Sequence, residues 1–342
     1  MRRVVGGIML LLAVAAAVLV GGGSLVWGRL QNPYKGYEAA ERFIVIAPGT
    51  RTPEIGRLLV EAGVIRDECT FRATLWWSGR SRALQAGEYR FDRPLAASDV
   101  VERLARGDVH TRRLTFPEGL TIREMAGLYE SRGFGAAARF LEAAANVSLI
   151  RDLDGEAVDL EGYLFPETYA LPREIPASRL IAMMVDRFRA TYTDQWRRST
   201  REQGWTLRQV VTLASLVEKE TGKPAERAVI AAVYRNRLKV GMGLQADPTV
   251  VFAMRKTGTY DGNIRRADLA LDSPYNTYRY AGLPPGPIAA PGAAALEAAL
   301  LPSPVSYLYF VSRNDGSHVF ARTLAEHNRN VREFQVRFFR RR

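Results

Sequence analysis

The stretch ASLVEKETG (residues 214–222) closes a segment, residues 207–217, that is apolar almost all round. A helix that is apolar on every side belongs in a protein interior. This one ends in two carboxylates, Glu218 and Glu220. A buried carboxylate is costly unless it is paired with a cation or takes up a proton. Because an acid catalyst needs a proton that it keeps at neutral pH, the segment predicts a buried helix carrying a candidate acid.

Helical spacing places both glutamates beside apolar neighbours and cannot choose between them. Glu218 and Glu220 are two residues apart, so their side chains cannot face the same point, and Lys219 between them is expected to face water. The alternative to an acid catalyst is a structural ion pair, in which one or both glutamates bind Arg227 or Arg235. Spacing leaves both interpretations open.

The net charge of the chain indicates which classes of binding partner to expect. The 342 residues include 48 Lys and Arg against 36 Asp and Glu, which gives a formal net charge of +12. Such a charge is typical of proteins that bind nucleic acid, an anionic membrane or an acidic polymer. Because the sequence holds no helix-turn-helix, zinc-finger or RNP motif, we expect no nucleic-acid partner and favour a membrane surface or an acidic polymer.

Cysteine and histidine are too sparse to suggest a metal site. Cys69 is the single cysteine, and His110, His318 and His327 are dispersed along the chain. A disulfide within the chain is therefore impossible, and Cys69 is expected to be a small core residue. We expect no metal and no cofactor.

The first residues predict how the chain meets a membrane. After MRR, residues 4–27 form a run of 24 residues without a charge. As a helix this run is about 36 Å long, enough for a bilayer core of about 30 Å. Arg2 and Arg3 favour a cytoplasmic N-terminus (residues 1–3), with everything after residue 30 on the other side. A cleaved signal peptide, with a cleavage site at the small residues 15–17, is the alternative.

A pattern recurs at a distance of 70 residues. FIVIAPGTRTPEIGRLLVEAGV starts at Phe43 and RLTFPEGLTIREMAGLYESRGF starts at Arg113, so that Gly49 aligns with Gly119. Each copy predicts a strand, a Gly turn and an amphipathic helix that ends at Gly. The repeat suggests two small α+β modules, although chance similarity of two such units remains open.

Polar and aromatic residues gather after the glutamate helix. LQADPTV holds Gln245 and Asp247, and a loop dense in Pro, Gly and Tyr holds Tyr275, Asn276 and Tyr278. Such side chains line carbohydrate grooves, because amides and carboxylates bind hydroxyl and acetamido groups while rings stack on sugar faces. Taken singly, each is also typical of a turn or of core packing.

The order of these motifs resembles the MltG (YceG-like) family of endolytic murein transglycosylases. The matching strings, which span residues 160–328, are EGYLFPETY, LASLVEKET, VYRNRL, LQADPTVVF, YNTYRYAGLPPGPIAAPG, YLYFV and HVFARTLAEHN. The resemblance implies an α+β protein with a single N-terminal transmembrane helix (residues 4–27) and a LysM-like α+β module (residues 40–112). A mixed α+β, YceG-like catalytic domain with a glycan cleft follows (residues 113–335), with a possible second strand–helix copy at residues 113–170.

The resemblance also implies roles for individual residues. Glu218 falls on the catalytic acid of the family's EKET string. Supporting positions fall on Glu220, Glu161 and Glu167, and substrate-binding positions around the cleft fall on Gln245, Asp247, Tyr275, Asn276 and Tyr278.

The implied reaction cleaves the bond between N-acetylmuramic acid and N-acetylglucosamine in nascent peptidoglycan and leaves 1,6-anhydro ends. The family implies an enzyme anchored in the cell inner membrane that terminates glycan strands, with peptidoglycan synthases (penicillin-binding proteins) as partners. One alternative is a muramidase-type hydrolase, with Glu218 paired to Glu220 or Asp247. Another is a non-catalytic, membrane-anchored scaffold that binds peptidoglycan.

Overall fold

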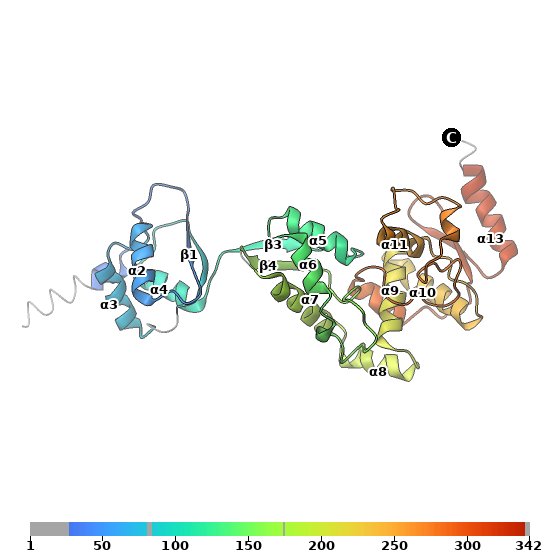
Figure 1. Cartoon of the computed structure of the whole chain (residues 1–342), viewed down its shortest axis with the longest axis horizontal. Helices are drawn as coiled ribbons and strands as arrows, with labels where there is room; N and C mark the ends of the chain where they lie inside the picture. The colour runs from blue at the N-terminus through green and yellow to red at the C-terminus, as the bar shows by residue number, and fades with distance from the viewer. Residues whose placement is uncertain (1–26, 81–83, 174, 339–342) are drawn as a thin grey trace, which may run out of the picture. The chain divides into compact units, whose positions relative to one another are not determined.

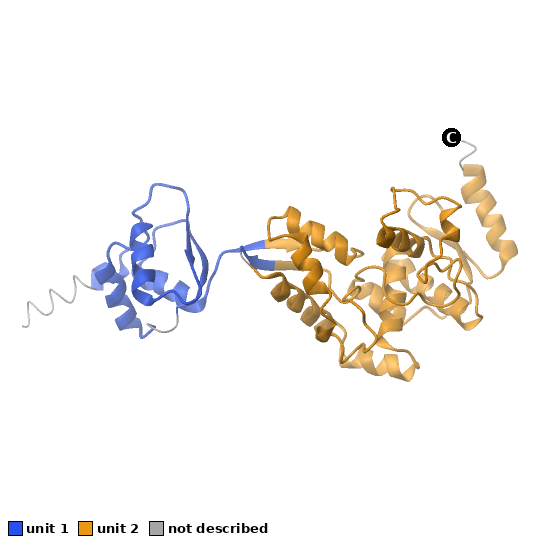
Figure 2. Cartoon of the chain, viewed as in Figure 1, with its two compact units in different colours: residues 1–112, 170–173 blue, residues 113–169, 174–342 orange. Residues whose placement is uncertain are grey.

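The computed structural model describes residues 27–80, 84–173 and 175–338, which form a mixed α+β structure as predicted (Figure 1). Apart from Trp27, the predicted transmembrane run (residues 4–27) lies outside these residues. Among the helices of the described part, none combines the length and apolarity needed to cross a bilayer. The chain divides into two compact units, residues 1–112 with 170–173 and residues 113–169 with 174–342 (Figure 2).

The first unit pairs one short sheet with helices. Strand β1 (Arg42–Ile46) runs antiparallel to β2 (Gly87–Phe91), so that Ile44 lies opposite Tyr89. Its helices are α2 (Thr52–Glu61), α3 (Glu68–Ser78) and α4 (Ala97–Arg106). The core is apolar and includes Ile46, Leu59, Phe71, Tyr89 and Leu104.

Cys69 departs from the expectation of a core residue. It lies near the start of α3 and is exposed. The buried face of this helix is formed by Thr70, Phe71, Thr74 and Leu75 instead. The sequence prediction was wrong because it used the average behaviour of free cysteine, whereas the face of the helix decides burial.

The repeated sequence forms similar local structure twice. Gly49 and Gly119, with φ of +84° and +78°, lie between strand and helix in each copy. The second copy consists of β3 (Thr111–Thr115) and α5 (Ile122–Ser131). Strand β3 pairs with β4 (Thr168–Pro172), and the boundary between the two units falls within this strand pair. Positive φ explains the glycines, because a side chain there would be strained.

The second unit contains most of the remaining helices. They are α6 (Ala137–Ala144), α7 (Ala177–Thr191), α8 (Asp194–Glu202), α9 (Leu207–Glu220), α10 (Pro224–Lys239), α11 (Asp247–Thr257), α12 (Ala293–Leu300) and α13 (Leu324–Val331). An antiparallel hairpin, β5 (Tyr309–Ser312) with β6 (His318–Ala321), precedes α13. Short turns of other helix types cover Val147–Leu149, Asp268–Ala270 and Arg332–Arg337.

Helix α9 is the buried helix that the sequence predicts. A capping box between Thr206 and Gln209 starts it, and residues 210–217 are all buried. It packs against α8, α10, α11 and α12, which accounts for an apolar surface on every side. Pro224 occupies the first turn of α10, as expected for a residue without a backbone donor. The glutamates therefore sit at the end of the most buried helix of this unit.

Candidate active site

Glu218 lies in the last turn of α9 with a side chain that is only 6% exposed. A backbone N–H, that of Gly292, donates a 3.0 Å hydrogen bond to its Oε2. The segment before Gly292 is held in place because Ala290 exchanges backbone hydrogen bonds of 2.8 Å with Gly119 and Leu120. The Pro/Gly-rich loop thus delivers a donor to the carboxylate from a distant part of the chain.

Two more charged groups surround Glu218. The Nη2 atom of Arg227 lies 3.6 Å from Glu218 Oε1 and 3.8 Å from Glu118 Oε2. Both distances exceed a hydrogen bond, so two carboxylates share one guanidinium without tight pairing. The site is therefore a buried acid with a neighbouring acid and one loosely held cation.

These surroundings raise the pKa of the Glu218 carboxyl above its usual value. Burial is the main cause, and the nearby charge of Glu118 adds to it. The hydrogen bond from Gly292 and the charges of Arg227 and Lys219 act in the opposite direction. The net effect favours the protonated carboxyl, which is the form that a general acid requires.

The ion-pair alternative from the sequence is met only in part. Arg227 lies at ion-pair distance from Glu218, as described. Arg235 does not approach either glutamate: its Nη1 donates to Gln203 Oε1 at 2.6 Å, and its guanidinium lies 4.3 Å from the centre of the Trp205 ring. The alternative pairing with Arg235 is therefore not formed, because its guanidinium is held by Gln203 and by the Trp205 ring.

Glu220 belongs to a second cluster. The Tyr234 hydroxyl donates to Glu220 Oε1 at 2.7 Å, and the Tyr278 hydroxyl donates to Asp247 Oδ1 at 2.5 Å. Burial raises the pKa of Glu220, and the charge of Asp247 raises it further. The structure therefore brings together three of the predicted site residues, Glu220, Asp247 and Tyr278, at the C-terminal end of α9 and the start of α11.

The loop residues differ in what they offer a ligand. Gln245 is exposed and has a φ of +48°, a strained value for a residue other than glycine. Asn276 is fully buried: its Nδ2 donates to the carbonyls of Leu269 and Leu271, and its Oδ1 accepts from the Tyr278 N–H. These hydrogen bonds show that Asn276 stabilises the conformation of its own loop. Contact of Gln245 and Asn276 with substrate stays a prediction.

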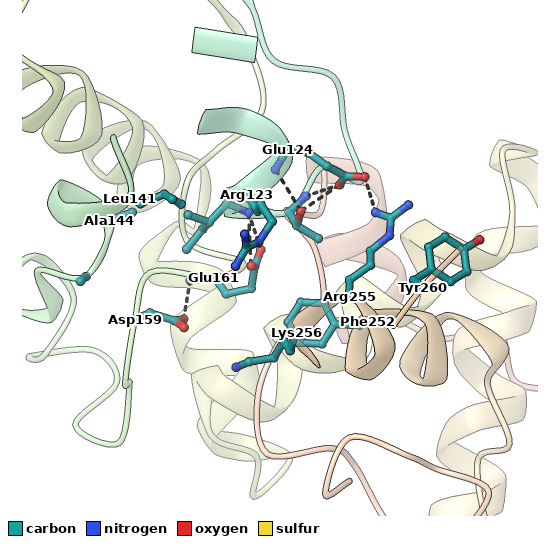
Figure 3. A pocket seen from close by; sticks show the side chains of 13 residues that line it. Arg123, Glu124, Leu141, Ala144, Asp159, Glu161, Phe252, Arg255, Lys256 and Tyr260 are labelled. Atoms are coloured by element: carbon teal, nitrogen blue, oxygen red, sulfur yellow. Dashed lines mark hydrogen bonds and ion pairs between the residues drawn. The ribbon is translucent and has the colours of Figure 1, made fainter. Parts of the chain in front are cut away.

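A cavity of about 580 Å³ opens beside α5 and α11 (Figure 3). Figure 3 shows Glu124 and Arg255 meeting on one side and Glu161 beside Asp159 on the other. The Ile122 N–H lies 3.2 Å from each oxygen of Glu161. The Tyr275 ring packs on Phe252, another lining residue, with ring centres 4.9 Å apart.

Glu161, like Glu218 and Glu220, is a carboxyl group with a raised pKa. Burial raises it to about 8, with smaller contributions from Asp159 and Glu124, against the opposing hydrogen bond from Ile122 and the charge of Lys256. Glu161 is therefore protonated at neutral pH. The sequence marked it only as a supporting residue, because no local pattern reports how deeply a loop carboxylate is buried.

A smaller cavity, of about 270 Å³, adjoins the first. The two share Thr121, Phe252, Arg255 and Tyr260 as lining residues. Lys219 and Asp247 line the smaller cavity, so polar groups continue toward the end of α9. We refer to the two adjoining cavities as the trough. Glu218 lines neither of them and lies one residue from its Lys219 end.

The remaining candidate lies apart from the trough. Glu167 forms an ion pair with Arg187, and both side chains are close to half exposed. Its backbone carbonyl accepts a hydrogen bond from the Phe116 N–H. Lys219 is exposed, as expected, and its Nζ also donates to the Gly119 carbonyl at 3.1 Å.

Three groups beside Glu218 were given no catalytic or binding role in the sequence analysis. Gly292 ends the PPGPIAAPG loop, Glu118 lies in the TFPEGLT string, and Arg227 entered only as an alternative ion-pair partner. A Cβ on Gly292 would lie 1.8 Å from Glu118 Oε1, so glycine is required if Glu118 keeps this position. Of these three groups, Glu118 is the one that the sequence could have indicated, because its string TFPEGLT belongs to the repeat.

Comparisons with known proteins agree with these motifs. Residues 44–333 match the model of the YceG-like family. The endolytic murein transglycosylase of Bacillus subtilis is 31% identical over 329 residues, which cover 91% of this chain and 90% of that protein. The endolytic murein transglycosylase of Streptococcus pneumoniae is 29% identical over 320 residues, or 84% of this chain and 57% of that protein. A crystal structure of a yceG-like protein from Listeria monocytogenes superposes with a TM-score of 0.59 at 29% identity, covering 85% of this chain and 98% of the other.

Proposed function

Because this chain belongs to the YceG-like family, we propose that it is an endolytic murein transglycosylase, the activity for which its relatives are named. Its substrate is the glycan strand of peptidoglycan, and it cleaves the bond between N-acetylmuramic acid and N-acetylglucosamine. The observation that supports this most is the environment of Glu218. A carboxyl group that is 6% exposed and has a raised pKa is suited to act as a proton donor.

The proposed reaction needs one carboxyl group. Protonated Glu218 donates its proton to the glycosidic oxygen, that bond breaks, and positive charge develops at the anomeric carbon. The resulting carboxylate then accepts the proton of the muramic acid 6-hydroxyl, whose oxygen attacks that carbon and forms the 1,6-anhydro ring. No water is consumed, because the intramolecular hydroxyl replaces it. Acid–base catalysis of this kind contributes about 10²–10⁴-fold to the rate.

The neighbours of Glu218 suit both halves of this cycle. Before the reaction, Arg227 Nη2 lies 3.6 Å from Glu218 Oε1, too far for a hydrogen bond, so it lowers the pKa of this carboxyl only in part. Once the proton has left, the same cation and the Gly292 N–H stabilise the carboxylate. A loosely held cation therefore stabilises the carboxylate that forms during the reaction, while the pKa of Glu218 stays raised.

We place the glycan along the trough and over the loop that holds Tyr275, Asn276 and Tyr278. Asp247 lines the trough, and the Tyr278 hydroxyl donates a hydrogen bond to Asp247. Sugar rings stack on aromatic faces while their hydroxyls bind carboxylates and amides. In this proposal Tyr275, Asn276 and Gln245 shape or extend the sugar-binding surface, and Glu161, Glu167 and Glu220 support it.

The proposal includes the setting of the enzyme. Residues 4–27 would anchor the chain in the cell inner membrane with residues 1–3 in the cytoplasm, and the catalytic part (residues 113–335) would face the cell wall. A LysM-like module at residues 40–112 would bind glycan, and peptidoglycan synthases would supply the nascent strands that this enzyme terminates.

Digestion of isolated peptidoglycan by the wild-type chain and by Glu218→Gln tests the function. Glutamine keeps the shape of the side chain but has no proton to donate, so cleavage is expected to fall at least 100-fold. Product masses decide the reaction type, because 1,6-anhydro ends lack the water that hydrolysis adds. Glu202→Gln, at the exposed end of α8, is the matched control and should cleave like the wild type.

Each alternative gives a different result in this experiment. Products that carry one added water would make the chain a hydrolase. Absence of cleavage by the folded wild-type chain would favour the non-catalytic scaffold. Full activity of Glu218→Gln would remove Glu218 from the mechanism and leave the family activity to another acid.

A further inference from the structure

Three tryptophans form an exposed patch on the first unit, and the proposed reaction does not use them. Trp76 is 81% exposed, Trp77 63% and Trp27 47%. The rings of Trp27 and Trp77 meet edge to face, with centres 5.4 Å apart, and Trp76 lies 6.5 Å from Trp77. We call these residues the tryptophan patch. Single exposed apolar residues are common, whereas a contiguous exposed cluster marks an interaction surface.

The core of the unit does not require this arrangement. Helix α3 buries Phe71 and Leu75 at 1% and 4% exposure, and these residues pack in the core. The two tryptophans that follow lie outside it, and α3 then ends at Gly79. Two of the largest apolar side chains are thus left in water, which is costly unless another surface covers them.

The sequence before the patch indicates what that surface is. Residues 4–27 carry no charge, and Trp27 is the last of them. Trp27 packs on Trp77, so the end of the apolar run lies within the patch. Tryptophan is enriched where a bilayer meets water, since its ring is amphipathic and its N–H finds polar partners there.

Positive charge accompanies the patch. Arg29, two residues after Trp27, and Arg72, four residues before Trp76 on α3, are both exposed. Residues four apart lie on the same face of a helix, so Arg72 and Trp76 face the same surroundings. Cations beside an aromatic cluster suit anionic lipid headgroups.

We propose that Trp27, Trp76 and Trp77 form a membrane-interface patch that inserts among lipid headgroups and holds α3 against the bilayer. The three rings come from two segments, so they attach the first unit to the membrane at more than one point. The unit is then held at the membrane surface by α3 as well as by the proposed anchor, residues 4–27. The occupant is the lipid interface, and sugar rings, which also stack on tryptophan, are the competing occupant that the experiment must exclude.

The single cysteine of the chain provides the probe. Cys69 is exposed on α3, seven residues or two turns before Trp76, and therefore faces the same way. The full chain carries an environment-sensitive fluorophore on Cys69 and is reconstituted in vesicles that contain anionic lipid and a headgroup-attached nitroxide. We expect the nitroxide to quench the wild-type signal by at least half, and the Trp76→Ser/Trp77→Ser variant to show quenching reduced at least threefold.

Val45→Ser is the matched control. Val45 is 56% exposed on β1 of the same unit, so its replacement removes apolar surface outside the patch, and quenching should equal that of the wild type. Circular dichroism and thermal melting check that the variants fold. If the double variant does not fold, Trp76→Ser alone, at the most exposed ring, should still lower the quenching by about half.

Three results would overturn the proposal. Wild-type quenching no greater than in vesicles without nitroxide would show that α3 does not lie at the bilayer. Equal quenching in wild type and the tryptophan variants would show that the rings do not hold it there. A change in label emission on adding isolated glycan strands to the detergent-solubilised chain, lost in the double variant, would assign the patch to sugar instead.

Discussion

Single side chains around Glu218 decide whether this position can act as an acid. The carboxyl is buried, receives one backbone hydrogen bond and lies 3.6 Å from Arg227. Within the described residues, Arg227 Nε is buried without a hydrogen-bond partner. Arg227 therefore stabilises the ionised form of Glu218, because the carboxylate that remains after proton transfer gains a positively charged neighbour.

Replacing Arg227 by Gln tests this balance. The arginine lowers the pKa of Glu218, so its loss raises that pKa and moves the alkaline limb of the pH–rate profile to higher pH. The charged intermediate loses a partner at the same time, so kcat is expected to fall about tenfold. Rates of strand cleavage across pH measure both effects, with exposed Arg201→Gln as the control. An alkaline limb that moves to lower pH would contradict the assigned role.

Glu161 gives a pH-dependent effect on stability. Its pKa is about 8 in the folded chain against 4.5 ordinarily, so above pH 4.5 the unfolded chain loses this proton first. The contribution of Glu161 to the free energy of unfolding is therefore fully present below pH 4.5 and is lost as the pH rises toward 8. Because one pKa unit corresponds to about 1.4 kcal/mol, the shift from 4.5 to about 8 corresponds to a loss of about 5 kcal/mol of unfolding free energy.

The comparison of wild type with Glu161→Gln isolates this effect. Glutamine stays neutral, so the variant should lose less stability than the wild type between pH 5 and pH 9. Denaturant unfolding at several pH values gives the difference. Parallel curves for the two proteins would mean that Glu161 is ionised in the folded chain.

At the scale of elements, the site depends on α9 being joined to the Pro/Gly-rich loop. Ser215 is fully buried on α9; its hydroxyl donates to the Thr212 carbonyl and accepts from the Ile288 N–H at 3.1 Å. The same loop continues to Gly292, which binds Glu218. One helix thus holds the loop and carries the acid, so their relative position is fixed by α9.

Ser215→Ala tests this connection. The change leaves the buried Ile288 N–H without its partner, which costs about 1–3 kcal/mol of unfolding free energy. Ser131→Ala, which removes an exposed hydroxyl from the last turn of α5, should cost less than about 0.5 kcal/mol. Chemical denaturation measures both variants. Equal effects would mean that the loop is held by other contacts.

For the whole molecule, charge governs contact with an acidic polymer. We expect the net charge of +12 to attract peptidoglycan, whose stem peptides carry carboxylates. Binding of the Glu218→Gln chain to isolated peptidoglycan should weaken at least fivefold as salt rises from about 0.05 M to about 0.5 M, because exposed charges are screened. Sedimentation with the polymer measures the bound fraction. Binding that does not respond to salt would point to sugar and ring contacts alone.

The sequence by itself determined the local structure and the candidate acid. The apolar run before Glu218 predicts a buried α9, and the repeat predicts strands, turns and helices that the structure contains. Local patterns succeed here because burial of a helix face and a positive φ at Gly119 are properties of short segments.

Only the tertiary structure decided which groups meet at the acid. Glu118 and Gly292 come from distant segments and Arg227 comes from the helix that follows α9, and together with burial their approach to Glu218 determines how its pKa shifts. The depth of Glu161 was likewise invisible in its own string. The physical reason is that desolvation and Coulomb interaction depend on distance in space, and periodicity in the sequence carries no information about distance between segments that are far apart in the chain.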